Sequence, residues 1–341
     1  MTTLTRQRGM YPGSAWNAPM TEPMMLPDDV LAAQRAVTEP ATGAIFARHV
    51  ALDRREGVVP PLNRHRLLWP EPRLDWAQSV ALVRDAFKLV GGELAAQAAA
   101  IIDDETRLHR TETATGDCAA FTTPKGWKGR KQVEITFESD GTISDAVYLA
   151  HELGHMLAFD MAEEAGSGGD MMPRHAIELP AFYTQVMFYD YLASHPDPAL
   201  RRAGFAHAAG ELTRSLYGQK AAYAAQGLDA AATSSVYKAR LEEALGPEWM
   251  YFRAAGRAGF GAYDLHTYSS APLIGLGLYH VAPRSPELLQ ALFARGQATD
   301  ILEIFAASGV TTTEALQEFF RQALARAIAP LAQAAAAATA A

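Results

Sequence analysis

Hydrophobic residues recur at intervals of three and four along much of the chain, which is the spacing of helices that bury one face. The first clear run has its apolar side chains at Trp76, Val80, Val83, Phe87 and Val90. Asp75 stands immediately before this run as a capping residue, and the pair Gly91 and Gly92 follows it as a helix terminator. We therefore expect a helix over residues 75–90, and a second, alanine-rich helix from there to about Arg110.

A strand-like pattern comes next, in which hydrophobic and polar residues alternate. Residues 131–139 read KQVEITFES and place three hydrophobic side chains on one face, and the shorter segment CAAFTT at 118–123 has a similar character. The turn sequence Asp140-Gly141 follows the longer segment. This pattern predicts a small antiparallel sheet.

Helical patterns dominate the rest of the chain. Thr142 and Asp145 have the spacing of a T-x-x-D capping box, which predicts the start of a helix that contains LAHELGHMLA at residues 149–158. The glycine-rich loop GSGGD separates it from the next apolar run, LPAFYTQVMFYDYL. Further helical periodicity covers about residues 198–226, 233–245, 285–307 and 312–336. The prediction is a mainly α-helical α+β fold with a helical C-terminal half, in which the small sheet packs beside the helix of residues 149–158.

The two ends of the chain differ from its middle. Residues 1–72 are rich in Pro and Met and contain short apolar pieces such as DDVLAAQRAV, which predicts an extended arm with short helices laid over a surface. Residues 337–341 end a low-complexity alanine run and are expected to be a disordered tail. Residues 73–336 then form a single domain.

Charge and cysteine content narrow the range of functions. The net charge is −8 and the chain has no block of Lys and Arg, which argues against binding to nucleic acid or to an anionic membrane. Cys118 is the single cysteine, so neither a disulfide framework nor a cysteine-based zinc site is expected. No apolar run is long enough to span a membrane, and no signal-peptide core follows the first basic residues, so we expect a cytoplasmic protein.

The segment HELGH, residues 151–155, carries the most specific chemistry. Because about 3.6 residues complete a helical turn, His151 and His155 project from the same face and can bind one metal ion. Glu152 between them can then act as the general base for hydrolysis, which is the chemistry of the HExxH motif. The alternative is a pair of histidines that merely pack on the face of a half-buried helix.

A catalytic zinc needs a third protein ligand and an open position for water. The metzincin continuation of the motif is excluded, because Ala158 and Met161 occupy the positions of its glycine and its third histidine. Asp160 points away from the histidine face, and Glu163 and Glu164 lie more than two turns along the helix from the ion. The third ligand is therefore expected after the glycine-rich loop.

Glu178 and His175 are the candidates beyond this loop. Glu178 stands at the start of the next apolar run, where Pro180 suits the first turn of a helix. A helix that returns antiparallel after a loop of this length would bring Glu178 beside His155. His175 remains open as the alternative ligand.

These residues resemble a known family. The combination of HELGH with a Glu-x-Pro helix start is similar to that of the oligoendopeptidase F and thimet oligopeptidase family of zinc metallopeptidases. Three longer segments resemble the same family, namely LDWAQSVALVRDAF, DGTISDAVYLAHELGHML and LLQALFARGQATDILEIFAASGV. The resemblance covers about residues 74–335. It implies a helical zincin fold, a peptide substrate, Glu152 as general base, and one Zn2+ per chain bound by His151, His155 and Glu178.

The chain departs from the family pattern in three respects. Ala158 stands where members usually have a histidine, and Gln185 stands where they commonly have a second Glu, seven residues beyond the ligand Glu. Losing that second carboxylate is expected to loosen the orientation of the ligands without abolishing metal binding. Residues 1–72 are too few to form the family's helical N-terminal half, which walls a deep channel. The family's restriction to short peptides is therefore not carried over to this chain.

In the family, a late segment similar to H-x-Y-x-x-P, followed by several tyrosines, stabilises the negative charge of the transition state. His266 and Tyr268 match its start, with one inserted residue before the proline. Aliphatic residues replace the tyrosines expected just after the proline, and Tyr279 comes next. The resemblance thus implies catalytic roles for His266 and Tyr268, and for Tyr279 either such a role or ordinary core packing.

We expect a zinc-dependent peptidase that hydrolyses oligopeptides or a short precursor peptide. An extended substrate would add as a strand to an exposed sheet edge, formed by Ala119–Thr123 or Val133–Phe137 unless both are interior strands. Two alternatives remain open: a catalytically silent peptide-binding protein on the same scaffold, and a dedicated processing enzyme for one modified precursor peptide. A homodimer also remains open, whereas nucleic acid and membranes are not expected as partners.

Overall fold

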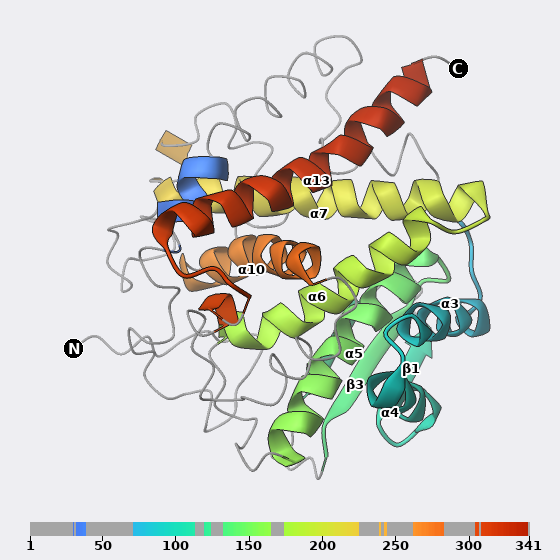
Figure 1. The fold of residues 1–341 in the computed structure, drawn as a ribbon. Helices are drawn as coiled ribbons and strands as arrows, with labels where there is room; N and C mark the ends of the chain where they lie inside the picture. The colour runs from blue at the N-terminus through green and yellow to red at the C-terminus, as the bar shows by residue number, and fades with distance from the viewer. Residues whose placement is uncertain are drawn as a thin grey trace.

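The fold is built mainly from helices, and the helix that carries HELGH packs against both a small sheet and neighbouring helices (Figure 1). The structure, a computed structural model, describes residues 30, 32–38, 71–112, 119–123, 132–164, 174–224, 239, 242–243, 262–282, 304–306 and 308–339. Its helices are α3 (Trp76–Lys88), α4 (Gly92–Asp103), α5 (Ile143–Glu164), α6 (Arg174–Ala193), α7 (Pro198–Ala224), α10 (Ala262–Val281) and α13 (Thr313–Thr339). The strands are β1 (Leu108–Glu112), β2 (Ala119–Thr123) and β3 (Glu134–Ser139).

The first predicted helix is confirmed as α3, together with its cap. The Asp75 side chain accepts a hydrogen bond from the backbone N–H of Gln78 at 2.8 Å, and the Gln78 side chain accepts one from the backbone N–H of Asp75 at 2.8 Å. At the other end, Gly91 and Gly92 have φ angles of 74° and 60°. Only glycine adopts this left-handed conformation without strain, so the pair separates α3 from α4.

The alanine-rich helix is shorter than predicted. It ends at Asp103, and the residues up to Arg110 that we expected to be helical instead turn into strand β1. The cause is local, because the Asp104 carboxylate accepts hydrogen bonds from both the N–H and the hydroxyl of Thr106, at 2.9 and 2.6 Å, and so forms a turn. Arg107 then binds both carboxylate oxygens of Asp160 on α5, which fixes the turn against the long helix.

The sheet is mixed, which corrects the prediction that it is antiparallel. Its strand order is β1-β3-β2, with β1 parallel to β3 and β2 antiparallel to β3. Among the described strands, Ala119–Thr123 therefore forms an edge, as expected, whereas residues 134–137 of the other candidate segment belong to the central strand. Ile135 and Phe137 of β3 are fully buried on the inner face, where Phe137 packs against Trp76 at a ring distance of 5.0 Å.

Helix α5 begins where predicted, but its first turn is bonded differently from a T-x-x-D box. The Thr142 hydroxyl accepts from the N–H of Ser144 at 3.2 Å, rather than from that of Asp145. The buried Asp145 carboxylate instead accepts from the Ser139 hydroxyl at 2.6 Å and from the N–H groups of Asp140 and Gly141 at 3.0 and 3.2 Å. These bonds tie the end of β3 to the start of α5, so the sheet and the helix hold a defined relative position.

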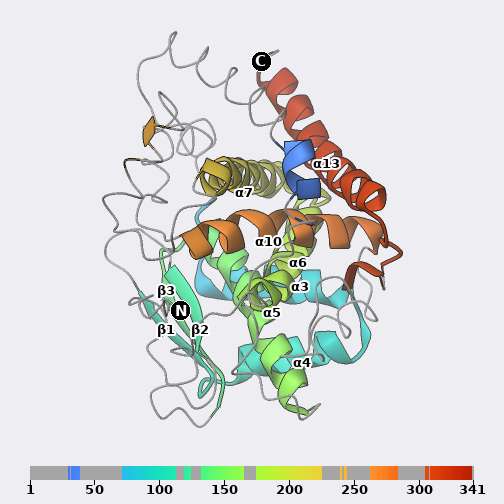
Figure 2. The ribbon, with the colours of Figure 1, turned by 90° about the vertical axis from the view of Figure 1, so that its left-hand side faces the viewer.

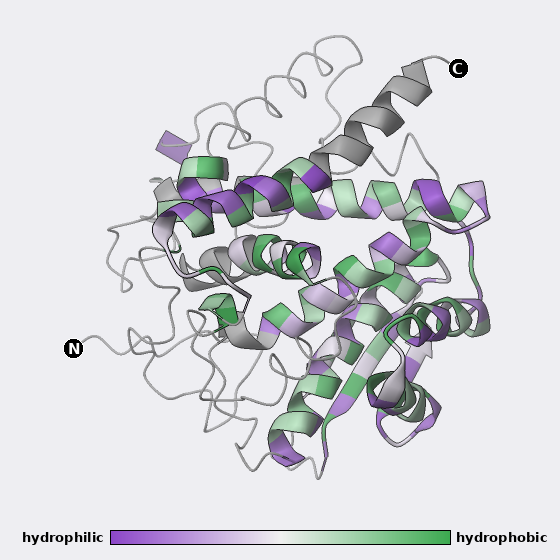
Figure 3. Cartoon of the chain, viewed as in Figure 1, coloured by the Kyte–Doolittle hydropathy of each residue, from purple (hydrophilic) through white to green (hydrophobic). Residues whose placement is uncertain are grey.

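Helix α10 was not predicted. In two perpendicular views it lies between α6 on one side and α7 and α13 on the other (Figures 1 and 2). Figure 3 shows hydrophobic residues on several sides of its described turns, and Leu273, Ile274 and Leu278 are all buried. A helix covered on several sides has no single apolar stripe, so the periodicity that predicts surface helices is absent.

The other C-terminal helices agree with the prediction where they are described. Helices α7 and α13 match the segments 198–226 and 312–336. Helix α13 continues to Thr339, so the first residues of the expected disordered tail are helical. Most of the predicted helices 233–245 and 285–307 lies outside the described residues, although residues 304–306 are helical.

The N-terminal arm contributes one described helical piece. Residues 32–38 are helical, as the segment DDVLAAQRAV predicts, and Val30 and Ala33 are buried. The Gln34 side chain donates to the carbonyl of Ser270 in α10 at 3.4 Å. This piece therefore packs against the core through its buried side chains. Among the described helices, none is long and apolar enough to cross a membrane.

Candidate metal centre

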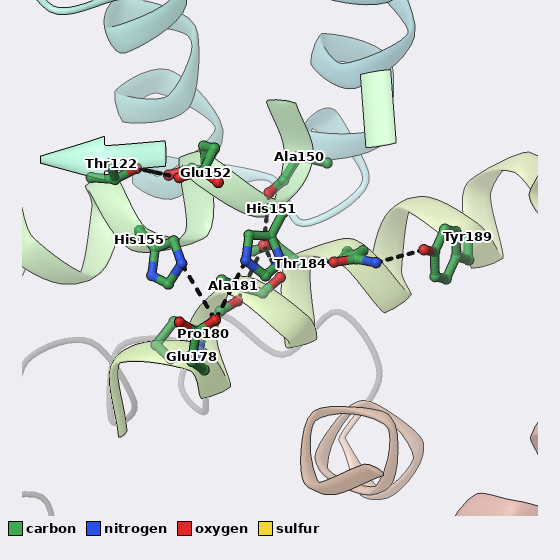
Figure 4. A network of polar contacts seen from close by, with 11 residues as sticks. Thr122, Ala150, His151, Glu152, His155, Glu178, Pro180, Ala181, Thr184 and Tyr189 are labelled. Atoms are coloured by element: carbon green, nitrogen blue, oxygen red, sulfur yellow. Dashed lines mark hydrogen bonds and ion pairs between the residues drawn. The ribbon is translucent and has the colours of Figure 1, made fainter. Parts of the chain in front are cut away.

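Three potential metal ligands meet where α5 faces α6. His151 and His155 lie one turn apart on α5, and Glu178 reaches them from α6 (Figure 4). The Nε2 atoms of His151 and His155 lie 3.5 and 3.6 Å from Oε2 of Glu178. All three ligand atoms lie within 4.8 Å of one another, and His155 and Glu178 are buried. Of the described residues, these are the ones that form such a cluster.

The two separations between the histidine nitrogens and the glutamate oxygen fit a tetrahedral ion. In a zinc site with bonds of about 2.0–2.1 Å, neighbouring ligand atoms lie about 3.4 Å apart. The separations of 3.5 and 3.6 Å are close to this value, and they exceed the roughly 2.7–3.2 Å of an ordinary N–H···O hydrogen bond. Two imidazoles and one carboxylate leave a fourth tetrahedral position open. The residues present thus fit a catalytic zinc.

The close approach of the two helices depends on Gly154. A Cβ atom at this position would lie 2.6 Å from Cα of Ala181 and 2.7 Å from the carbonyl oxygen of Pro180. Both are backbone atoms of α6, which cannot move aside as a flexible side chain would. On the same contact surface, the Thr184 hydroxyl lies 2.8 Å from the carbonyl oxygen of Ala150. The glycine of HELGH therefore sets the distance between the histidines and Glu178.

We expect Gly154→Ala to lower the free energy of unfolding by about 1–3 kcal/mol, the usual range for overpacking. The variant should also bind Zn2+ more weakly, because α6 must shift and carry Glu178 away from the histidines. Gly210→Ala is the matched control, since a Cβ there meets only the end of the Arg214 side chain at 3.9 Å. Urea unfolding and competition with a chromophoric chelator measure both effects. Wild-type zinc affinity in Gly154→Ala would contradict this role of the glycine.

Helix α6 begins one turn earlier than predicted. It starts at Arg174, so Glu178 is its fifth residue and Pro180 lies inside the helix rather than in its first turn. The helix continues through Pro180, which has no N–H group to donate to the preceding turn. The side chain of His175, the alternative third ligand, lies outside the described residues.

A hydrogen-bonded chain leads from His151 away from the ligand cluster. Nδ1 of His151 lies 2.7 Å from Oε1 of Gln185, and the Gln185 amide donates to the hydroxyl of Tyr189 at 2.5 Å (Figure 4). Because the amide oxygen is an acceptor, it places the histidine proton on Nδ1 and leaves the lone pair of Nε2 for a metal. Gln185 therefore orients His151 at the position where the family commonly has a Glu.

Variants of Gln185 should change metal affinity in opposite directions. Gln185→Leu removes the acceptor, and we expect zinc binding to weaken roughly 10- to 100-fold, as for other groups that orient metal ligands. Gln185→Glu keeps the acceptor and adds a negative charge, so we expect it to bind zinc more tightly than the wild type. Competition titrations with a chelator rank the zinc affinities of the wild type and the two variants. Equal zinc affinities would show that Gln185 has no influence on the metal site.

The acidic groups around His151 also control its charge. Burial by itself lowers the pKa of His151, but the adjoining carboxylate of Glu178 and the negative charge of Glu152 outweigh it and raise the pKa to about 9. In the metal-free protein, His151 is therefore protonated on both ring nitrogens at neutral pH. A bound cation displaces one of these protons, so its binding weakens as the pH falls.

Glu152 points away from Glu178 and toward the sheet. Its side chain is 4% exposed, and Oε2 accepts a hydrogen bond from the hydroxyl of Thr122 on β2 at 2.7 Å (Figure 4). On a helix, a residue adjacent to His151 is rotated by about 100°, which places Glu152 next to the His155 side of the cluster. The candidate general base thus lies between the two histidines and the edge strand. Thr122 was not among the predicted site residues, although the alternation of β2 places it on the inner face.

The other acids of α5 are not near the cluster. Asp160 is engaged by Arg107 through both oxygens, in agreement with its exclusion as a ligand. Glu163 and Glu164 are exposed at the end of the helix.

Tyr279 contacts residues of α6 that lie beyond the ligand Glu178 in that helix. Its hydroxyl donates to the Asp190 carboxylate at 2.7 Å, and its ring packs against Tyr183 at 5.3 Å. Asp190 follows Glu178 by twelve residues in α6, which is about 18 Å along the axis. Tyr279 therefore packs in the core, in the wall of a pocket between α6, α7 and α10. His266 and Tyr268 lie in the first half of α10, but their side chains are outside the described residues.

Comparisons with known proteins reveal similarity only at the level of structure. No protein-family model and no curated protein matches this sequence. A solved structure described as oligoendopeptidase F from Bacillus anthracis has a TM-score of 0.65 and 14% identity, and the match covers 92% of this chain and 57% of that one. A structure described as a peptidase from Chlamydophila abortus has a TM-score of 0.60 and 14% identity, covering 89% and 56%.

A third similar structure is Pz peptidase A with an inhibitor, at a TM-score of 0.60 and 13% identity, with 91% of this chain and 59% of that one covered. The chain thus spans little more than half the length of these structures. Identities this low bear on the fold alone. The protein has a mainly helical α+β fold like that of the solved structures described as oligoendopeptidase F and Pz peptidase A.

Proposed function

We propose that this protein is a zinc-dependent peptidase that hydrolyses peptide bonds of oligopeptides or of a short precursor peptide. The observation that carries the proposal is the cluster of His151, His155 and Glu178, in which both separations between histidine nitrogen and glutamate oxygen are those of a tetrahedral zinc site. Glu152, buried beside this cluster, provides the carboxylate that such chemistry requires.

The chemistry divides between the ion and the protein. A zinc ion, when bound, polarises the scissile carbonyl and lowers the pKa of the attacking water. Glu152 accepts one proton from this water as the water oxygen bonds to the carbonyl carbon. It then releases the proton to the leaving nitrogen as the C–N bond breaks. His266 and Tyr268 are proposed as donors to the negatively charged oxygen, from their place on α10.

The substrate is proposed to bind as an extra strand along β2. Among the described strands, β2 has β3 as its one neighbour, so backbone groups on its other side face away from the sheet. Thr122 of this strand contacts Glu152, so a peptide paired with β2 lies next to the proposed base. Backbone pairing gives affinity for an extended chain with little dependence on its sequence.

Zinc content and peptide hydrolysis, measured on the same protein, test the proposal. We expect about one zinc per chain, cleavage of members of a quenched peptide library, loss of cleavage on chelation, and recovery when one equivalent of zinc is returned. A zinc-loaded protein that binds peptides and cleaves none would instead favour a silent binding protein. Cleavage of a single precursor, with no cleavage of the library, would indicate a dedicated processing enzyme. Full activity without metal would overturn the zinc mechanism.

A further inference from the structure

The contact between Thr122 and Glu152 joins the edge strand to the proposed base. The Thr122 hydroxyl oxygen lies 2.7 Å from Oε2 of Glu152 and 3.3 Å from the backbone carbonyl oxygen of the same residue. Both side chains are buried, each with 4% of its surface exposed. A hydroxyl that donates to a buried carboxylate forms a strong, charge-assisted hydrogen bond.

We propose that Thr122 is a positioning residue for Glu152: it holds the carboxylate in the orientation from which the base takes and returns its proton. The proposal rests on the function proposed above. It assigns a role in the reaction to a residue outside the HExxH motif and outside the three metal ligands.

The donor is held firmly in place. Thr122 is β-branched, which restricts rotation about its χ1 angle, and it pairs with Ile135 in the register of β2 with β3. The end of β3 is in turn bound to α5 through Asp145 and Ser139. The hydroxyl and the carboxylate thus belong to one connected unit, and the hydrogen bond favours the Glu152 rotamers that keep the carboxylate beside Thr122.

The Thr122 hydroxyl has a second acceptor nearby, the backbone carbonyl oxygen of Glu152, and this matters because the charge of the Glu152 side chain changes during the reaction. A hydroxyl has one hydrogen to donate. While Glu152 is ionised, this hydrogen is directed to Oε2. When Glu152 carries the proton taken from water, the Thr122 hydroxyl can turn its hydrogen toward the carbonyl oxygen 3.3 Å away. The buried hydroxyl then has a partner in both states, which avoids the cost of an unsatisfied polar group.

The arrangement also connects substrate binding to the base. A peptide that pairs with β2 adds backbone hydrogen bonds to the strand that carries Thr122. When β2 is ordered in this way, the Thr122 hydroxyl is held in position, and so is the Glu152 carboxylate to which it donates. We therefore expect Thr122 to affect turnover more than peptide affinity.

Thr122→Val tests the proposal, because it removes the hydroxyl with little change in shape. We expect kcat to fall roughly 10- to 100-fold, the range for losing a hydrogen bond to a charged group, with KM and zinc content close to wild type. Thr122→Ser keeps the donor and should restore most of kcat. Thr38→Val is the matched control, since Thr38 is also a buried threonine, and its hydroxyl donates to the carbonyl oxygen of Gln34 rather than to a carboxylate.

A double-mutant cycle separates positioning from a structural role. In a Glu152→Gln background, Thr122→Val should cause a much smaller further fall in the residual kcat, and peptide affinity measured by anisotropy should not change. Thr122→Ala is carried through the same measurements, with thermal unfolding of every variant. A fall in kcat matched by loss of zinc or of folded protein, or a failure of Ser to rescue, would assign Thr122 a structural role and overturn the proposal.

The two proposals fail in different ways. If the zinc-loaded wild type cleaves no peptide, the proposed function fails, and the role of Thr122 fails with it. If the wild type cleaves peptides and Thr122→Val does so with unchanged kcat, only the positioning role is overturned.

Discussion

Glu152→Gln is expected to lower kcat for peptide hydrolysis by about 10²- to 10⁴-fold, the contribution of a well-placed general base. The amide has nearly the same size as the carboxylate, and its oxygen can still accept the hydrogen bond from Thr122, but it cannot carry the proton from water to the leaving nitrogen. Zinc content and peptide affinity should therefore remain at wild-type levels. Steady-state kinetics on the best library peptide, with zinc analysis of the same preparation, provide the measurement.

Glu164→Gln is the control for this experiment. It makes the same chemical change on the same helix, at an exposed position in its last turn, and should leave kcat unchanged. If Glu152→Gln turned over peptide as fast as the wild type, another group would have to carry the proton. If both proteins failed to cleave any peptide while still binding it, the scaffold would serve binding alone.

Glu178→Ala is expected to abolish stoichiometric zinc binding and, with it, hydrolysis. Two histidines would remain, and losing a direct ligand should weaken binding by more than the roughly 10- to 100-fold that follows loss of an orienting group. Thermal unfolding gives an independent measurement, because a ligand that binds only the folded state stabilises it. At a zinc concentration about 100 times the Kd, this stabilisation is about 2.7 kcal/mol. The wild type should show such a zinc-dependent rise in melting temperature and the variant should not.

Glu163→Ala serves as the comparison, since it removes an exposed carboxylate from the end of α5. It should bind zinc as the wild type does. Retention of one tightly bound zinc by Glu178→Ala would show that another residue completes the site. His175, which lies three residues earlier in α6, would then be the first candidate to replace.

Local patterns in the sequence were enough to predict several elements of the fold and most of the metal cluster. The cap at Asp75 and the break at Gly91 depend only on neighbouring residues, and the structure confirms both. The common face of His151 and His155 follows from helical geometry in the same way. Glu178 was identified because few candidates remained within reach of a returning helix, and the structure brings it to the two histidines.

Long-range contacts decided the features that were missed or misassigned. Strand β1 pairs in parallel with β3, and Arg107, just before this strand, is held by Asp160, more than fifty residues away in the chain. Helix α10 is covered by α6, α7 and α13, so its sequence lacks the one-sided pattern by which helices are recognised. Tyr279 was a candidate on sequence alone, and only its bond to Asp190 shows that it belongs to the core.

The sequence by itself determined which side chains could bind a metal, because ligand type and spacing within one helix are local properties. Only the tertiary structure decided which residues hold those side chains in place. Gln185 contacts His151, and Thr122 contacts Glu152, across 34 and 30 residues of chain. Such pairs form only when separate elements pack together, and no periodicity or local spacing encodes them. Gly154 combines the two kinds of information. It lies within the local HELGH motif, but only the packed structure shows that the backbone of α6 leaves no room for a side chain there.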